Sequence, residues 1–191
     1  MSEFKSKRNR VWLENGRVHK LILAGAGAAT AEFEILKRLY AVGAAVPQVL
    51  DLDGDLLILE YVKGMTLTEA VEREIICAVM LAERITCWFA AFYAVFPDRI
   101  RGDVNCRNFI ITPDTRVFGI DFEDLKYGRK ETDLGRLAAF ILNDDPPYTD
   151  YKKRLAQSLT DCFAAGFGID RESAAREQIH ETEAMRRRRQ P

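Results

Sequence analysis

The chain has 191 residues, of which 48% are hydrophobic and 30% are charged, and its 28 Lys and Arg nearly balance its 29 Asp and Glu. Intrinsic disorder needs low hydrophobicity with high net charge, and nucleic-acid-binding domains usually carry a clear basic excess. Neither description fits this composition. We therefore expect one compact domain or two small lobes, and no nucleic-acid partner.

The cysteines and the apolar stretches bear on the compartment. No basic-then-apolar signal peptide opens the chain, and the longest apolar stretch, Ile85 to Phe96, is shorter than the roughly 20 residues of a membrane helix. Far apart and without C-x-x-C spacing, the cysteines predict reduced thiols rather than a zinc site or a disulfide framework. They are Cys77, Cys87, Cys106 and Cys162. We expect a cytoplasmic protein without a membrane span.

The first sixty residues predict antiparallel strands around one helix. Asn15-Gly16 between two apolar runs is the signature of a type I′ hairpin, because both central residues of that turn need positive φ. A flexible stretch, residues 24–29, is expected before a helix from Ala31 to Val42. A second hairpin is predicted over residues 47–62, with its turn at Asp53-Gly54.

After Lys63-Gly64 the pattern becomes helical. Thr66-Leu67-Thr68-Glu69 fits a capping box, and residues 85–96 are apolar nearly all round, as in a buried core helix. Further helices are expected at residues 134–142, 151–165 and 172–187. The sequence thus predicts an α+β fold with an N-lobe over residues 1–62 and a helical C-lobe over residues 63–191.

A short hairpin carries the residues that point to chemistry. Two β-rich runs within residues 109–120 are joined by a turn, and an antiparallel ladder brings their outer ends to about 5 Å. Asn108 and Asp121 flank these runs, and a carboxamide oxygen beside a carboxylate suits Mg²⁺. Asp103 precedes Asn108 by one tight loop, near enough to accept a proton from a hydroxyl that attacks a metal-bound phosphate. Asp and Asn also favour turns at strand ends, but the ordered set favours a site.

A second pair is predicted in the β-rich part. Strand alternation places Lys20 on an apolar face between Val18 and Ile22, where a charge needs a partner. Glu32 shares the apolar stripe of the following helix with Leu36, so it is the acid expected to face the sheet and meet Lys20. The alternative is two solvated charges.

Together these residues resemble the protein-kinase-like fold, of the aminoglycoside and choline phosphotransferase type and of small bacterial lipopolysaccharide-kinase-like enzymes. Residues 101–108 are similar to the H-G-D-x-x-x-x-N catalytic loop, and Ile120-Asp121-Phe122-Glu123-Asp124 is similar to the D-F-G segment. Residues 57–64 resemble the hinge between the lobes. The resemblance implies a minimal bilobal α+β fold, with a small antiparallel β-rich N-lobe containing one helix and a mainly helical C-lobe.

The resemblance also implies ATP- and Mg²⁺-dependent transfer of the γ-phosphate to a hydroxyl group. Asp103 would orient or deprotonate that hydroxyl, and Asn108 and Asp121 would hold Mg²⁺. Lys20, fixed by Glu32, would hold the α- and β-phosphates. Asp121 and the acids after it concentrate negative charge where the metal would sit.

Further expectations follow from the same family pattern. The backbone of Glu60 and Val62 would meet the adenine edge, and Asp133, the aspartate at the start of a later helix, would brace the catalytic loop. Residues 125–132 are too few for a regulatory activation loop or a wide peptide platform. A small-molecule or sugar hydroxyl is therefore the expected acceptor, and a protein acceptor is the alternative.

Two departures from the family pattern stand out. Residues 1–9 contain no glycine, so the glycine-rich phosphate loop is missing. Ser6, Lys7 and Arg8 would cover the phosphates instead, or the terminus is frayed and solvated, which we expect. Arg101 replaces the histidine of the catalytic loop, a mostly architectural residue.

Other interpretations remain at this point. Gly25-Ala26-Gly27, with Asp51 and Asp53 downstream, is a partial dinucleotide fingerprint, but Thr30 stands at its third position. A kinase-like scaffold that binds nucleotide without efficient turnover is the main alternative to an enzyme. Residues 186–189 form an arginine run that we expect to be a solvated helix end complementing the helix dipole.

Overall fold

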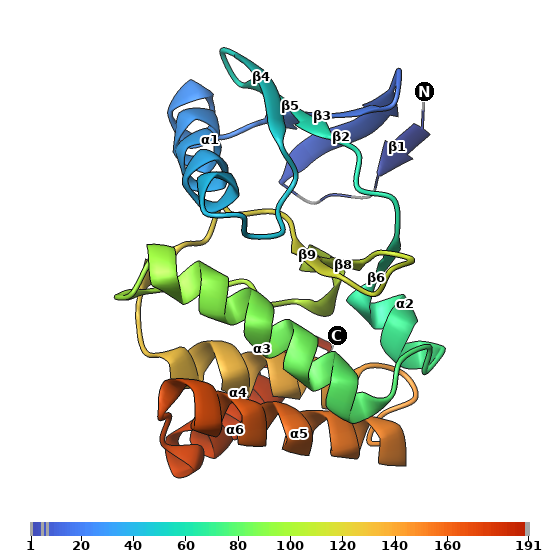
Figure 1. Cartoon of the computed structure of the whole chain (residues 1–191). Coiled ribbons are helices and arrows are strands. Elements are labelled where there is room, and N and C mark those ends of the chain that lie inside the picture. Colours follow the sequence, from blue (N-terminus) through green and yellow to red (C-terminus); the bar gives the residue numbers. More distant parts are fainter. Residues whose placement is uncertain (1, 5, 7, 190–191) are drawn as a thin grey trace.

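The computed structural model describes residues 2–4, 6 and 8–189, and it has a β-rich upper part and a helical lower part (Figure 1). The upper part is a five-stranded antiparallel sheet with strand order β1-β2-β3-β5-β4, and α1 packs against three of its strands. Below it lie a three-stranded sheet, β6-β8-β9, and the helices of the C-terminal part. This is the predicted kinase-like α+β fold.

Turn chemistry accounts for the hairpins of the upper sheet. Asn15 and Gly16 have φ angles of 50° and 74°, and Glu14 pairs with Arg17, which confirms the predicted type I′ turn. Gly54, with φ of 60°, closes the second hairpin. The elements are β1 (Ser2–Phe4), β2 (Asn9–Glu14), β3 (Arg17–Ile22), α1 (Ala26–Ala41), β4 (Val49–Asp53) and β5 (Leu56–Glu60).

The expectation of a frayed N-terminus is wrong. Residues 2–4 form β1, which pairs antiparallel with β2 so that Glu3 lies opposite Trp12 and Phe4 opposite Val11. The edge of β2 offers free backbone donors and acceptors, and a short strand satisfies them. Met1 and Lys7 lie outside the described residues.

The predicted flexible stretch before α1 is also wrong. The helix begins at Ala26, directly after Gly25, whose φ of 90° turns the chain out of β3. Small residues then fill the first turn, and Ala29 is fully buried. Because β3 is antiparallel to both of its neighbours, β2 and β5, the glycines do not belong to a parallel βαβ unit, and the dinucleotide interpretation fails.

The helical part follows the predicted pattern with a break after its first helix. Thr66 and Glu69 form the expected capping box. The chain then breaks at Glu74, which has a φ of 49°, before the long core helix begins. The elements are β6 (Met65–Thr66), α2 (Leu67–Glu72), α3 (Ala78–Val95), β7 (Arg99–Ile100), the 3₁₀ turn Cys106–Asn108, β8 (Phe109–Ile111), β9 (Val117–Gly119), β10 (Lys126–Tyr127), α4 (Lys130–Asn143), α5 (Asp150–Phe167) and α6 (Arg171–Arg189).

Helix α3 is the centre of the core. It is long and apolar enough to be a candidate membrane span by length and composition, but buried core helices pass the same test. Phe89 and Phe92 on α3 are fully buried, and Phe89 stacks edge-on against Phe163 of α5 at a centroid distance of 5.2 Å. The helix therefore has a structural role inside the fold.

All four cysteines of the chain are free thiols.

One apolar core joins the upper and lower parts. The loop after α1 inserts Ala45 into the lower part, where its carbonyl oxygen accepts hydrogen bonds from Trp88 Nε1 at 2.9 Å and from the Gly119 amide at 3.0 Å. The position of α1 is thereby tied to the β8-β9 hairpin. The exact boundary of the lobes at residues 62 and 63 stays a prediction.

Candidate active site

The ammonium group of Lys20 is the centre of an ionic cluster between the two parts of the molecule, in which Lys20 and Glu32 are buried and Asp121 and Glu123 are partly exposed. Its ammonium group lies 2.7 Å from Glu32 Oε2, 2.7 Å from Asp121 Oδ1 and 2.9 Å from Glu123 Oε1. A lysine ammonium has three hydrogen-bond donors. Here it donates to both carboxylate oxygens of Glu32 and to Asp121, and it forms an ion pair with Glu123. The cluster joins β3, α1 and the segment after β9, so residues about a hundred positions apart share one site.

Burial and charge oppose each other within this cluster. Glu32 is only 2% exposed, and burial raises the pKa of its carboxyl, while Lys20 lowers it. For Lys20, burial lowers the pKa, but Glu32 and Asp121 outweigh that effect and raise the pKa above its ordinary value. Lys20 therefore stays protonated at neutral pH. Glu32 also accepts a hydrogen bond from the Phe122 amide at 3.2 Å, which links α1 to residues 121–124, the acidic segment.

Arg101 holds the backbone on which Asp121 is mounted. Its guanidinium donates hydrogen bonds to the carbonyl oxygens of Ile120 and, at 3.0 Å, Asp121, and it lies 4.3 Å from the Phe122 ring centroid. Burial lowers the pKa of Arg101 to about 10. Asp121 has a φ of 65°, a left-handed conformation that needs such support in a residue other than glycine. The arginine at the usual histidine position thus has an architectural role.

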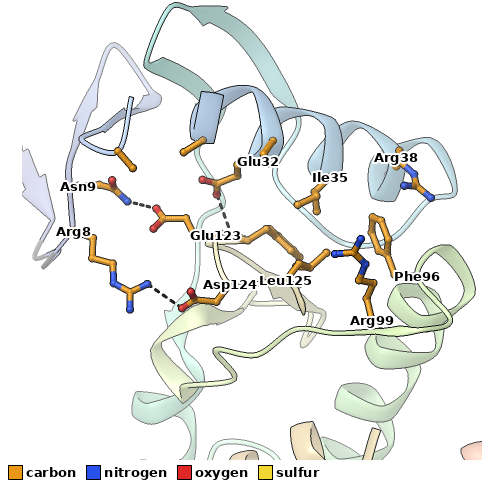
Figure 2. Close-up of a pocket in the computed structure, with 14 residues that line it drawn as sticks. Arg8, Asn9, Glu32, Ile35, Arg38, Phe96, Arg99, Glu123, Asp124 and Leu125 are labelled. Carbon is orange, nitrogen blue, oxygen red and sulfur yellow. Dashed lines mark hydrogen bonds and ion pairs between the residues drawn. The ribbon is translucent and has the colours of Figure 1, made fainter. Parts of the chain in front are cut away.

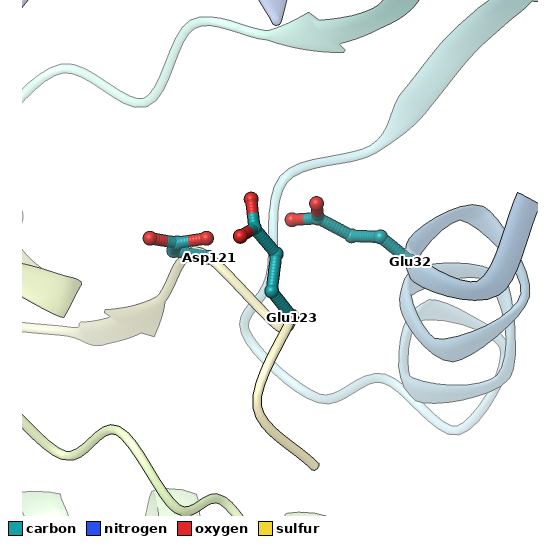
Figure 3. A group of neighbouring side chains, drawn as sticks. All are labelled: Glu32, Asp121 and Glu123. Carbon is teal, nitrogen blue, oxygen red and sulfur yellow. The ribbon is translucent and has the colours of Figure 1, made fainter. Parts of the chain in front are cut away.

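The donor set around Asp121 is suited to a hard cation. Oxygen atoms of Glu32, Asp121 and Glu123 lie within 4.8 Å of one another, and Figure 3 shows the three carboxylates facing a common space. Asn108 is the last residue of the 3₁₀ turn before β8, and its carbonyl oxygen accepts a hydrogen bond from the Ile120 amide at 3.0 Å. Asn108 thus lies opposite Ile120, the residue directly before Asp121. Carboxylate and amide oxygens fit Mg²⁺.

Asp133 braces the predicted catalytic loop, residues 101–108, from below. Its fully buried carboxylate accepts hydrogen bonds from the Arg101 amide at 2.8 Å, the Gly102 amide at 3.1 Å and the Tyr93 hydroxyl at 3.0 Å. Burial raises the pKa of Asp133, and these donors lower it. The next residue of the loop, Asp103, accepts a hydrogen bond from the Asn105 amide at 3.1 Å, which orients its carboxylate.

Gly102 lets the catalytic loop lie directly on the acidic segment. It has a φ of 78°, and a Cβ atom there would overlap the carbonyl oxygen of Asp124. Asp124 Oδ2 in turn accepts a hydrogen bond from Arg8 Nη1 at 3.0 Å, and Asn9 Nδ2 donates to Glu123 (Figure 2). The link between β1 and β2 thus reaches the site through polar side chains instead of glycines.

Two hollows flank the acidic segment. The larger one, about 750 Å³, lies between α1, the residues before β7 and Leu125 (Figure 2). The smaller one, about 350 Å³, opens at Asp103 and is walled by Arg136 of α4 and by Glu181 and Arg188 of α6. We expected the arginine run to be only a solvated helix end. Arg188 has a further role, because it donates a hydrogen bond to Glu181 beside the catalytic loop.

Glu60 and Val62 lie apart from the ionic cluster. Glu60 is the last residue of β5, and its amide donates to the Gln48 carbonyl at 2.9 Å. Val62 follows in the connection to β6, which leads into the lower part. Their predicted contact with adenine stays a prediction.

Several members of the site were not predicted from the sequence. The contact of Glu123 with Lys20 was one of them, and the contacts of Arg8 and Asn9 with the acidic segment were others. The only signal was the local concentration of acids after Asp121 and of basic residues near the N-terminus. Glu181 was also not predicted, because nothing in the sequence of α6 relates that helix to the catalytic loop.

Comparison with known proteins gives one family. The family model described as RIO1, RIO domain, matches residues 3–131, and no curated protein matches the chain. The RIO domain is an atypical protein-kinase-like family of ATP-binding phosphotransferases. The match supports the kinase-like fold but does not confirm the narrower resemblance to aminoglycoside, choline or lipopolysaccharide kinases. Because the match covers more than half of the sequence, the chain belongs to the RIO domain family.

Proposed function

We propose that the protein is an ATP- and Mg²⁺-dependent phosphotransferase that moves the γ-phosphate to the hydroxyl group of a small molecule or sugar. The observation that carries this proposal is the Lys20 cluster, in which one buried cation meets three carboxylates at the junction of the two parts. The catalytic loop presents Asp103 to a separate pocket. Positioning and charge neutralisation are most of what phosphoryl transfer needs.

Each residue then has a definite task. Lys20, fixed by Glu32, holds the α- and β-phosphates, and Asp121 and Asn108 hold Mg²⁺, with Glu123 as a further carboxylate close by. The metal, when bound, supplies positive charge against the phosphates. Asp103 takes the proton of the acceptor hydroxyl as its oxygen bonds to the γ-phosphorus. The bond from that phosphorus to the bridging oxygen breaks, and ADP leaves with the electron pair.

The size of the pocket at Asp103 supports a small acceptor. Its volume of about 350 Å³ is at the low end for small-molecule sites, and α4 and α6 wall it. Between Asp121 and α4 the chain forms only the two-residue strand β10, which supports the absence of a wide peptide platform. RIO kinases typically phosphorylate proteins or hydrolyse ATP, so a protein acceptor is the second candidate.

We place the protein in the cytoplasm because its thiols are free.

A nucleotide-binding scaffold without efficient turnover is the alternative from another functional class. Two observations favour it: the β1-β2 link contains no glycine, and Lys20 is already bound by three carboxylates. Against it, Lys20, Glu32, Asp103, Asn108 and Asp121 are all present.

ATP consumption with Mg²⁺ in the wild type, Asp103→Ala and Asp121→Ala separates these possibilities. We expect loss of activity in both variants, and equal rates in all three proteins would refute the enzyme. Thermal stabilisation by ATP tests the nucleotide site: Lys20→Ala should lose it. Lys153→Ala, which changes an exposed lysine on α5, should keep it.

A further inference from the structure

The pocket at Asp103 has basic residues on most of its walls. They come from four separate segments of the chain: the β1-β2 link, β10, α4 and α6. They are Arg8, Lys126, Arg136 and Arg188. Local helix or strand preferences cannot explain why four cations from such distant segments surround one small pocket. Their gathering is a property of the pocket.

Two of the three carboxylates that line the pocket, Asp124 and Glu181, form ion pairs with arginines. Asp124 is 3.0 Å from Arg8, and the buried Glu181 accepts a hydrogen bond from Arg188 and lies 3.7 Å from Arg136 Nε. Arg136 also donates to the Gly102 carbonyl at 3.1 Å. These ion pairs form the walls of the pocket, and among the described residues they leave its other two charged groups unpaired.

Two charged groups in this pocket form no ion pair with any residue that the structure describes. One is Asp103, the proposed proton acceptor. The other is Lys126, exposed on β10, whose Cε atom lies 3.3 Å from the position that a Cβ atom of Gly102 would take. The ammonium group at the end of this side chain is thus next to the residue that precedes Asp103. The pocket therefore offers a carboxylate that can accept the proton of a hydroxyl group and, separately, a cation that can bind an anion.

We propose that the acceptor carries a carboxylate or phosphate group close to the hydroxyl that receives the phosphate, and that Lys126 binds this anionic group. The inference rests on the proposed function, because it assigns the substrate class of the same site. Lys126 is then a specificity-determining residue. Arg136 and Arg188 share the single carboxylate of Glu181, so this pair of arginines leaves one further positive charge at the pocket. A neutral alcohol or sugar would leave the Lys126 ammonium without a partner and would bind more weakly.

Binding without ATP tests the proposal independently of turnover. Glycerol 3-phosphate and glycerol form a matched pair of probes that differ in the anionic group, and inorganic phosphate tests the anion alone. We expect calorimetry to detect glycerol 3-phosphate and not glycerol. Lys126→Gln should weaken that binding by about tenfold, the loss expected for one charge-assisted hydrogen bond. Lys153→Gln, a matched change on α5, should leave it unchanged.

The proposal is overturned if glycerol 3-phosphate and glycerol bind the wild type equally, if neither binds, or if Lys126→Gln binds as the wild type does. With ATP present, Lys126→Gln should raise the KM for the anionic acceptor and leave the KM for ATP unchanged. A rise in the KM for ATP alone would assign Lys126 to the phosphate donor and refute the proposal. Anion binding that depends on Lys126 without turnover in any variant would refute the proposed enzyme and keep the anion site.

Discussion

Replacing Lys20 with methionine removes the cation that pairs with the three carboxylates and keeps a side chain of similar length. Glu32, at 2% exposure, then loses a partner at 2.7 Å, and three carboxylates whose oxygens lie within 4.8 Å of one another face each other without compensation. Breaking a buried ion pair from one side costs about 3–5 kcal/mol. We expect Lys20→Met to lose that much stability at pH 7.

Urea denaturation followed by circular dichroism measures this loss. With a slope of about 2 kcal/mol per molar urea, the midpoint should fall by about 1.5–2.5 M. The matched control is Lys20→Met with Glu32→Leu, which removes both charges and should recover most of the loss. A loss below about 1 kcal/mol, as for a surface pair, or equal losses in the single and double variants, would refute the buried network.

The pH dependence of Lys20→Met gives a second test of the same cluster. Burial and Asp121 both raise the pKa of Glu32, and in the variant Lys20 no longer opposes them. A carboxyl whose pKa is higher in the folded state favours folding when it is protonated. The stability deficit should therefore be full at neutral pH and shrink as the pH falls through the folded pKa of Glu32. A deficit that grows on acidification would contradict this cause.

Urea denaturation also tests three other contacts. Asp133→Ala leaves three buried donors without their acceptor and should cost at least about 3 kcal/mol; a loss below about 1 kcal/mol would mean that water replaces the carboxylate. Gly102→Ala combines positive φ with a backbone overlap, so it should cost clearly more than Gly54→Ala, which has positive φ in open space and should cost about 1–2 kcal/mol. Equal losses would argue against close packing of the loop. Glu181→Gln should cost about 1–3 kcal/mol, whereas Glu183→Gln on the exposed face of α6 should stay within about 0.5 kcal/mol, and the reverse order would exclude a wall role for Glu181.

The hairpin and helix predictions succeeded where local chemistry decides the structure. Asn15-Gly16 has the positive φ angles that a type I′ turn demands, and Thr66 with Glu69 caps α2, because both signals act within four residues. The meeting of Lys20 and Glu32 was also predictable, since strand alternation and helical periodicity each put a charge on an apolar face.

The errors came from the same local rules. The run of Ala and Gly before α1 looked flexible, but packing buries Ala29 and extends the helix back to Ala26. The N-terminal residues looked frayed because they form a chain terminus without a glycine-rich loop, yet the free edge of β2 pairs with them as β1. In both places a tertiary contact outweighed a weak local preference.

The sequence by itself determined the order of the main hairpins and helices, the lobed layout and the positions of the main charged residues, because turns, caps and periodicity depend on neighbours along the chain. Only the tertiary structure decided which remote groups complete the site. Arg8 meets Asp124 across 116 positions and Asn9 meets Glu123 across 114, and α6 brings Arg188 to the pocket at Asp103. Such contacts follow from how the lobes and helices pack, which no local pattern encodes.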